Sequence, residues 1–338
     1  MGIDLNQLLS STQVFIDRCQ PDMDLMNNPG AVLGVIIASV VLAGKDKLTI
    51  IADGDFIHFG AWLEQLIAES SGKFGKGIIP IDKEPESDIN KYGSDRLFIY
   101  LRENGNFDDR IDELQNHDHP VLTFNINNSN IGAEFYRWEY AVAVACAILG
   151  INAFDQPDVQ DSKIRTVKLL NEYIENGDIK DFTYLWKDNN FSIYSNISDI
   201  VLGTDNISNI LSIFLDQSKP EYYTAINAYL PRNEINLEIL QRLRYKILEY
   251  TNTATSLGFG PRFLHSTGQL HKGGPNNCLI IQIVRNIEDD LFIPGKQYSF
   301  GTLINAQAMG DIHALISRDR PVLQIKVNNV EVLNEITF

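Results

Sequence analysis

Two charged side chains stand where amphipathic helices place apolar ones, and both could move protons. The first is Glu69, which falls on the apolar stripe of a predicted helix from Phe59 to Ser70. The stripe is formed by Phe59, Trp62, Leu63, Leu66 and Ile67. Burial would raise the pKa of this carboxyl group and suit it to proton transfer. The alternative interpretation is a glutamate near a helix end at Gly72, with its carboxylate in water.

The second misplaced charge is Lys163, in a predicted helix that begins after Asp155-Gln156-Pro157 and runs to about Glu175. Its apolar stripe consists of Val159, Val167, Leu170 and Ile174, and Lys163 lies four residues from both valines. A buried lysine needs an anionic partner or must lose its proton. The alternative is a stem that lies along the surface with its ammonium group in water.

A third segment, Gly258 to Pro275 (GFGPRFLHSTGQLHKGGP), concentrates glycine and hydrogen-bonding side chains between two strand-like runs. Polar loops on a rigid scaffold are typical of functional sites. His265 and His271 are six residues apart, which is poor spacing for two metal ligands on one helix face. No nucleotide motif is complete here or in the glycine-rich stretch after Ser71, so we expect neither a metal nor an organic cofactor.

Alternating short strands and helices must position these residues. Predicted strands cover Lys47–Ala52, Gly77–Ile81, Arg96–Leu101, Val121–Ile126, Tyr222–Leu230, Cys278–Val284 and Val322–Val327. Predicted helices cover Gly30–Gly44, Phe59–Ser70, Asp108–Asn116, Ala133–Leu149, Asn236–Thr251 and Gly301–Arg318. The pattern indicates an α/β fold with a parallel sheet covered on both faces, and a domain boundary near Asn176 to Lys180.

Composition excludes several classes of partner. The net charge of -16 opposes contact with nucleic acid or an anionic membrane surface, but leaves room for a small anionic substrate. The apolar run from Gly30 to Gly44 is shorter than the roughly 20 residues of a spanning helix. Cys19, Cys146 and Cys278 match no zinc or redox spacing, and we expect a reducing cytoplasm.

At these three places the sequence resembles the phosphoglucose isomerase (glucose-6-phosphate isomerase) family, whose two lobes are sugar-isomerase (SIS) domains. The stretch WLEQLIAESSGK resembles the segment around the family's catalytic base, FDQPDVQDSK resembles its second signature, and LHSTGQ resembles its histidine segment. The resemblance assigns the base to Glu69, the active-site lysine to Lys163 and the ring-opening histidine to His265, with Gln156 and Gln269 as substrate contacts. Asp158 replaces a small residue of the second signature, and the histidine segment follows that signature instead of preceding it.

The resemblance implies interconversion of glucose 6-phosphate and fructose 6-phosphate through an enediol, without a metal or organic cofactor. It implies a leading helical segment at 1–28, a three-layer SIS-type domain at 29–178 and a smaller α/β region at 179–338. The arrangement looks most like the isomerase portion of bifunctional transaldolase/glucose-6-phosphate isomerases. The family's phosphate loop and Gly-Gly-Arg signature are not found, so a front-half SIS domain or a homodimer partner is expected.

Two other functions stay open. One is a noncatalytic SIS-type module that binds sugar phosphate or docks to another chain, since half of the family's site is not found. The other is transaldolase activity, which needs a Schiff-base lysine, and no such motif is recognised. Retained turnover after Glu69→Gln would exclude the isomerase assignment.

Overall fold

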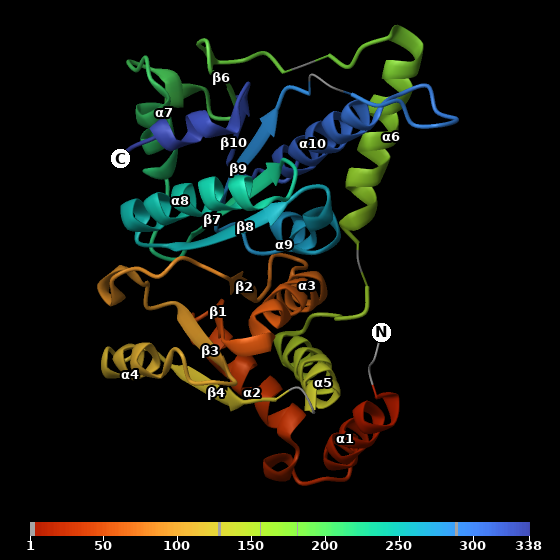
Figure 1. Cartoon of the computed structure of the whole chain (residues 1–338), viewed down its shortest axis with the longest axis vertical. Helices are drawn as coiled ribbons and strands as arrows, with labels where there is room; N and C mark the ends of the chain where they lie inside the picture. The colour runs from red at the N-terminus through yellow and green to blue at the C-terminus, as the bar shows by residue number, and fades with distance from the viewer. Residues whose placement is uncertain (1–3, 128–129, 156, 181, 288–289) are drawn as a thin grey trace. The chain divides into compact units, whose positions relative to one another are not determined.

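A computed structural model describes residues 4–127, 130–155, 157–180, 182–287 and 290–338, and omits the side chains of 159 and 160 (Figure 1). The chain divides into two compact units. The first contains residues 1–83 and 94–155, and the second contains 84–93 and 156–338. One unit holds a four-stranded parallel sheet and the other a mixed six-stranded sheet, so the predicted α/β class is confirmed.

The first unit is built on the sheet order β2-β1-β3-β4, with all neighbours parallel. Its strands are β1 (Lys47–Ala52), β2 (Ile79–Asp82), β3 (Arg96–Arg102) and β4 (Val121–Asn125). Its helices are α1 (Leu5–Arg18), α2 (Pro29–Leu42), α3 (Phe59–Ser71), α4 (Asp108–Asn116) and α5 (Ile131–Leu149). Helices α2, α3 and α5 share one core with β1 and β3, and α4 contacts β4.

Helix α2 occupies the most apolar run of the sequence. It begins at Pro29, and the side-chain oxygen of Asn28 accepts the Ala31 N–H at 2.9 Å, which satisfies one of the free donors of the first turn. Gly34 lets α2 approach α5 closely, because a Cβ there would lie 2.6 Å from the Ala141 carbonyl oxygen. In the described part of the chain, none of the helices combines the length and apolar character required to span a membrane.

The second unit has the sheet order β5-β6-β10-β9-β7-β8, parallel except at the two pairings made by β6. Its strands are β5 (Trp186–Lys187), β6 (Phe191–Ser195), β7 (Tyr223–Tyr229), β8 (Ala254–Phe259), β9 (Cys278–Arg285) and β10 (Val322–Val327). Its helices are α6 (Val159–Asn176), α7 (Ile207–Leu215), α8 (Glu234–Thr251), α9 (Thr267–Gly273) and α10 (Phe300–Ile316). The sequence patterns gave no bounds for β5, β6, β8, α7 and α9.

Helix α6 packs against α10 and therefore belongs to the second unit. The division falls after Asp155, whereas the sequence placed a boundary between 178 and 179. A helix that bridges two α/β patterns carries no local signal of which core it covers. Only its packing partner decides this.

The two faces of the second sheet differ in chemistry. One face is mainly apolar and packs against α7 and α8, with the buried hydroxyl residues Thr224 and Thr255 on β7 and β8. On the other face β7, β9 and β10 each place one buried amide in the same cross-strand row, namely Asn227, Gln282 and Gln324. This polar row faces α9 and α10, because Gln282 donates to the Ala308 carbonyl and Asn227 contacts His271.

Candidate functional site

Glu69 lies in the first unit, near the C-terminal end of α3. The helix is capped by Gly72, as predicted, and it buries Leu63, Glu64, Ile67, Ala68 and Ser71. Glu69 itself is half-buried, on the flank that also carries Trp62 and Leu66. The carboxylate on the fully buried face is Glu64, which the sequence pattern did not single out.

Lys163 is exposed, which agrees with the alternative interpretation of an ammonium group in water, and its place on a buried stripe of α6 is wrong. Val167 and Ile174 of that stripe are 55% and 43% exposed, while Ser162, Thr166 and Leu170 are buried. The reason is the close approach of α10 at Gly310, where a Cβ would lie 3.1 Å from Thr166 Oγ1. Ser162 and Thr166 therefore lie on the buried face of α6, and Val167 and Ile174 lie on its exposed face.

His265 ends the short 3₁₀ helix η6 (Arg262–His265), and its side chain is exposed. Gln156, a predicted substrate contact, lies outside the described residues. Gln269, the other predicted contact, is buried and forms a paired contact with Asp158. Its Nε2 donates to Asp158 Oδ2 at 2.8 Å, and its Oε1 accepts the Asp158 N–H at 3.2 Å.

The structure thus joins the second and third sequence motifs at the start of α6. Arg318 strengthens this junction by bonding Asp158 at 2.8 Å and Asp161 at 2.7 Å. Burial alone would raise the pKa of Asp161, but hydrogen bonds from Arg318 and Arg165 lower it below the ordinary range. Asp158, the departure from the family pattern, is therefore an anchor between α6, α9 and α10.

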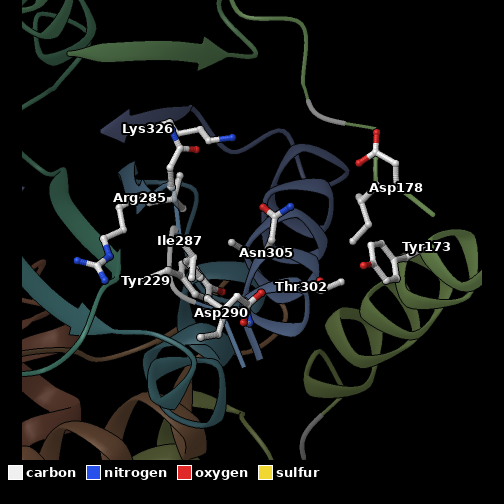
Figure 2. A pocket seen from close by; sticks show the side chains of 15 residues that line it. Tyr173, Asp178, Tyr229, Arg285, Ile287, Asp290, Thr302, Asn305 and Lys326 are labelled. Carbon is white, nitrogen blue, oxygen red and sulfur yellow. The ribbon is translucent and has the colours of Figure 1, made fainter. Parts of the chain in front are cut away.

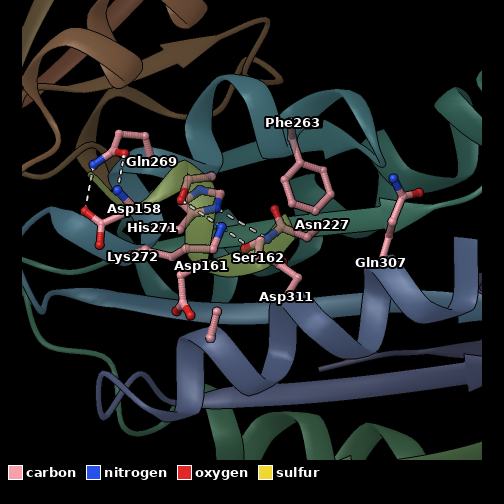
Figure 3. Close-up of polar contacts among 12 residues, drawn as sticks. Asp158, Asp161, Ser162, Asn227, Phe263, Gln269, His271, Lys272, Gln307 and Asp311 are labelled. Atoms are coloured by element: carbon pink, nitrogen blue, oxygen red, sulfur yellow. Dashed lines mark hydrogen bonds and ion pairs between the residues drawn. The ribbon is translucent and has the colours of Figure 1, made fainter. Parts of the chain in front are cut away.

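A buried charged cluster lies beneath this junction (Figure 3). Lys272 Nζ lies 2.8 Å from Asp311 Oδ1 and donates to the Gly268 carbonyl at 3.0 Å, and both charged side chains are almost fully buried. Asn227 Nδ2 lies 3.3 Å from His271 Nδ1. Within the described residues, His271 Nε2, Asn227 Oδ1 and Asp311 Oδ2 are buried without a hydrogen-bond partner.

Burial, with the charges of Lys272 and Arg320 nearby, lowers the pKa of His271 to about 3. This imidazole is therefore neutral at physiological pH. Protonation would place a second positive charge in a buried site near Lys272 and Arg320, which costs free energy. The sequence did hold a signal for the cluster. Each of β7, β9 and β10 interrupts an apolar run with a single amide, which is unusual for a strand buried on both faces.

A hollow of about 230 Å³ opens at the carboxyl ends of β9 and β10 (Figure 2). Its polar lining comes from Tyr173 and Asp178 near the end of α6, Asp290 and Thr302 at the start of α10, and Lys326 of β10. The lining of the hollow therefore carries both acidic and basic side chains. Figure 2 shows that the side chain of Arg285 extends away from the part of the lining that Tyr173 and Asp178 form.

The predicted site residues divide between the two units. Glu69 belongs to the first, whereas Lys163, His265 and Gln269 belong to the second, where Gln269 is hydrogen-bonded to the motif residue Asp158. Among the described residues, no group of three or more His, Cys, Asp or Glu side chains is arranged to hold a metal ion.

Comparison with known proteins finds similarity to glucose-6-phosphate isomerases of several organisms. It is 27% identical over 210 residues to glucose-6-phosphate isomerase of Methanocaldococcus jannaschii, covering 51% of this chain and 52% of that protein. It is 22% identical over 213 residues to glucose-6-phosphate isomerase of Leptospira biflexa, covering 51% of this chain and 47% of that protein. The same enzyme of Lactobacillus gasseri is 30% identical over 155 residues, covering 34% of this chain and 35% of that protein.

No protein-family model matches the chain. Among solved structures, the C-terminal domain of glucosamine-fructose-6-phosphate aminotransferase from Francisella tularensis aligns with 98% of this chain and 84% of that chain, at 10% identity and a TM-score of 0.29. A hypothetical protein of Thermus thermophilus aligns with 96% of this chain and 84% of that chain, at 11% identity and a TM-score of 0.33. Scores this low carry no argument about function.

The chain spans about half the length of the first two relatives, 52% and 47%. Its similarity to glucose-6-phosphate isomerases is distant but recurs across archaeal and bacterial sequences. The chain is therefore a distant relative of the glucose-6-phosphate isomerases.

Proposed function

We propose that this chain is part of an aldose–ketose isomerase that interconverts glucose 6-phosphate and fructose 6-phosphate. The observation that carries the proposal is the similarity to glucose-6-phosphate isomerases over about half of the chain. The motif matches at Glu69, Lys163 and His265 support it. Because the chain spans about half of those relatives, activity is expected to need a further SIS domain or a second copy.

In the proposed reaction Glu69 carries a proton between C2 and C1 through an enediol. This role requires a carboxylate that a ligand can reach, and the half-buried position of Glu69 at the end of α3 is compatible with it. Glu64 on the buried face of the same helix is less suited, because it is enclosed by the core.

Lys163 and His265 would assist ring opening by moving protons at the ring oxygen and the anomeric hydroxyl. Both side chains are exposed, so both can reach a ligand. Gln269 is already hydrogen-bonded to Asp158, so its contribution is to position the start of α6. A direct contact of Gln269 with substrate would require that bond to open.

The test is a coupled assay of fructose 6-phosphate conversion, with the chain alone and mixed with a front-half SIS polypeptide. Glu69→Gln keeps the shape of the side chain and removes the base, so turnover should fall by about 10²- to 10⁴-fold. Glu139→Gln, at an exposed position of α5, is the matched control. Unchanged turnover in Glu69→Gln would overturn the assignment of the base.

A second function is a noncatalytic module that binds sugar phosphate. The exposed positions of Lys163 and His265 are compatible with this function too, because an exposed side chain can bind a ligand without taking part in proton transfer. Binding of fructose 6-phosphate without turnover, alone and in the mixture, would identify this function instead. Loss of that binding in Lys163→Ala would locate the ligand.

A further inference from the structure

The second unit has a topological switch point between its neighbouring strands β7 and β9. The chain leaves β7 through α8 toward β8 on one side, and leaves β9 through α10 toward β10 on the other. Helix α8 covers the apolar face of the sheet and α10 covers the opposite face. In open α/β sheets, the crevice outside the carboxyl ends of such strands is where ligands bind.

A pocket of about 550 Å³ lies at this place, which is within the size range of small-molecule sites. Its wall is formed by residues that end or follow three strands: Leu230 after β7, Phe259 at the end of β8, and Ile287 after β9. Leu291, from the segment before α10, and Phe300, the first residue of α10, complete an apolar side. These two side chains are 74% and 50% exposed, so a bound molecule could cover them.

Three arginines line the same pocket: Arg232 after β7, Arg262 after β8 and Arg285 at the end of β9. This local concentration of positive charge contrasts with the net charge of the whole chain, which is -16. Among the residues that the structure describes, no carboxylate forms an ion pair with Arg232 or Arg285, and both are exposed.

Among the described residues of the pocket wall, the acidic one is Asp290, and it is already engaged. Asp290 Oδ1 accepts the Gly301 N–H at 2.8 Å, and its other oxygen accepts the hydroxyl of Ser299, so this carboxylate caps the start of α10. Its charge is therefore offset by the helix terminus. Within the described residues, the exposed guanidinium groups of Arg232 and Arg285 have no carboxylate partner and can therefore meet an anion from outside.

We propose that this pocket binds an organic phosphate with an apolar, ring-bearing body of nucleotide size. Guanidinium groups bind phosphate through paired, charge-assisted hydrogen bonds, and the exposed Phe300 and Leu291 offer a surface on which a ring can pack. The site goes beyond the proposed isomerase function, since its lining includes none of Glu69, Lys163 and His265.

Isothermal titration of the full chain with adenosine monophosphate, inorganic phosphate and adenosine tests this inference. The nucleotide should bind more tightly than either half-probe, because only it uses both the arginines and the apolar wall. Equal affinity for inorganic phosphate and the nucleotide would overturn the part of the proposal that concerns the ring-bearing body. An absence of nucleotide binding at millimolar concentration would overturn it entirely.

Two variants locate the site. Arg232→Ala combined with Arg285→Ala should weaken nucleotide binding at least about tenfold, the effect of roughly 1.4 kcal/mol. Phe300→Ala should weaken binding of the nucleotide but not of inorganic phosphate. Unchanged affinity in the double arginine variant would contradict the proposal.

Arg242→Ala is the matched control, because Arg242 lies on α8 and pairs with Glu238 away from the pocket lining. Arg285→Lys retains the charge and loses the paired geometry, so it should give an intermediate affinity. Glu69→Gln should bind the nucleotide normally even if it abolishes isomerase turnover, which separates this site from the proposed function.

Discussion

The two units differ at the carboxyl-terminal ends of their parallel strands. In the first unit, Asp53 follows β1 and its carboxylate accepts the backbone N–H groups of Glu103, Asn104 and Asn106, which follow β3. Tyr100 also donates its hydroxyl to Asp53 at 2.9 Å. In the second unit, the corresponding edge opens onto a pocket lined by arginines.

The difference shows how one architecture can serve stability or binding. In the first unit, the carboxylate of Asp53 accepts hydrogen bonds at the carboxyl-terminal edge of the sheet and links the ends of β1 and β3. Burial alone would raise the pKa of Asp53, but the three backbone donors and Tyr100 lower it to about 2. In the second unit the described carboxylate at this edge, Asp290, caps the start of α10, and Arg232, Arg262 and Arg285 line the pocket beside it.

The largest expected effect concerns the charged cluster beneath the open edge. Lys272→Met leaves the carboxylate of Asp311, only 1% exposed, without its cation. We expect the free energy of unfolding of the second unit to fall by about 3–5 kcal/mol. Urea unfolding followed by Trp186 fluorescence measures this, because Trp186 is the tryptophan of the second unit.

The paired substitution Lys272→Met with Asp311→Leu is the control for that experiment. It removes both charges and should recover most of the loss. If Lys272→Met alone were neutral, the cluster would not be a buried ion pair, and the contrast between the two sheets would weaken.

Asp53→Asn is expected to have the next largest effect, in the first unit. The amide keeps the shape but turns an acceptor into a donor facing backbone N–H groups, and the unfolding free energy should fall by about 2–3 kcal/mol. Fluorescence of Trp62 and Trp138, both in the first unit, reports the transition. Asp22→Asn, at an exposed position of the same unit, should change stability by less than about 0.5 kcal/mol.

Acid should weaken the second unit through His271. The folded state keeps this imidazole neutral, with its pKa near 3, whereas the unfolded chain takes up a proton near its ordinary value of 6.5. Stability is therefore complete above the unfolded pKa and falls as pH drops toward the folded one, by about 2 kcal/mol between pH 7.5 and 5.

The variant His271→Gln should remove that pH-dependent loss in the Trp186 transition. The Asp53 contribution has a lower window, since its pKa falls from 3.8 to about 2 on folding, and it is lost only as pH drops through that range. A second unit whose stability is as pH-dependent in His271→Gln as in the unchanged protein would show that other groups control its acid sensitivity.

The smallest expected effect is at the open edge itself. Arg285→Ala should change the unfolding free energy of the second unit by less than about 0.5 kcal/mol, because no described carboxylate pairs with the guanidinium. Chemical unfolding of the two proteins side by side measures this. A loss above about 1 kcal/mol, the size of an intramolecular hydrogen bond, would show that Arg285 is structural and that the edge is closed.

Most of the fold could be predicted from the sequence because its signals are local. The strands Lys47–Ala52 and Val322–Val327 and the helix Asp108–Asn116 occur with the predicted bounds. The short strand β5 and the seven-residue helix α9 were missed, since elements of this length show too little periodicity.

The candidate site could be predicted only in part. The motifs located Glu69, Lys163, His265 and Gln269, but the helical pattern assigned Lys163 to the wrong face. A helical wheel counts apolar residues, whereas the packing of α6 is set by the gap that Gly310 leaves in α10. The space between α6 and α10 depends on residues that are far apart in the chain, so no local pattern reports it.

By itself, the sequence determined the alternation of strands and helices, the absence of complete metal and nucleotide motifs, and the residues that resemble an isomerase. Only the tertiary structure decided which charges are buried and which sheet edge is open. Lys272 meets Asp311, and Asp53 meets the loop after β3, through contacts between distant segments. Periodicity reports how a segment folds, but the environment of a charge depends on every segment that packs around it.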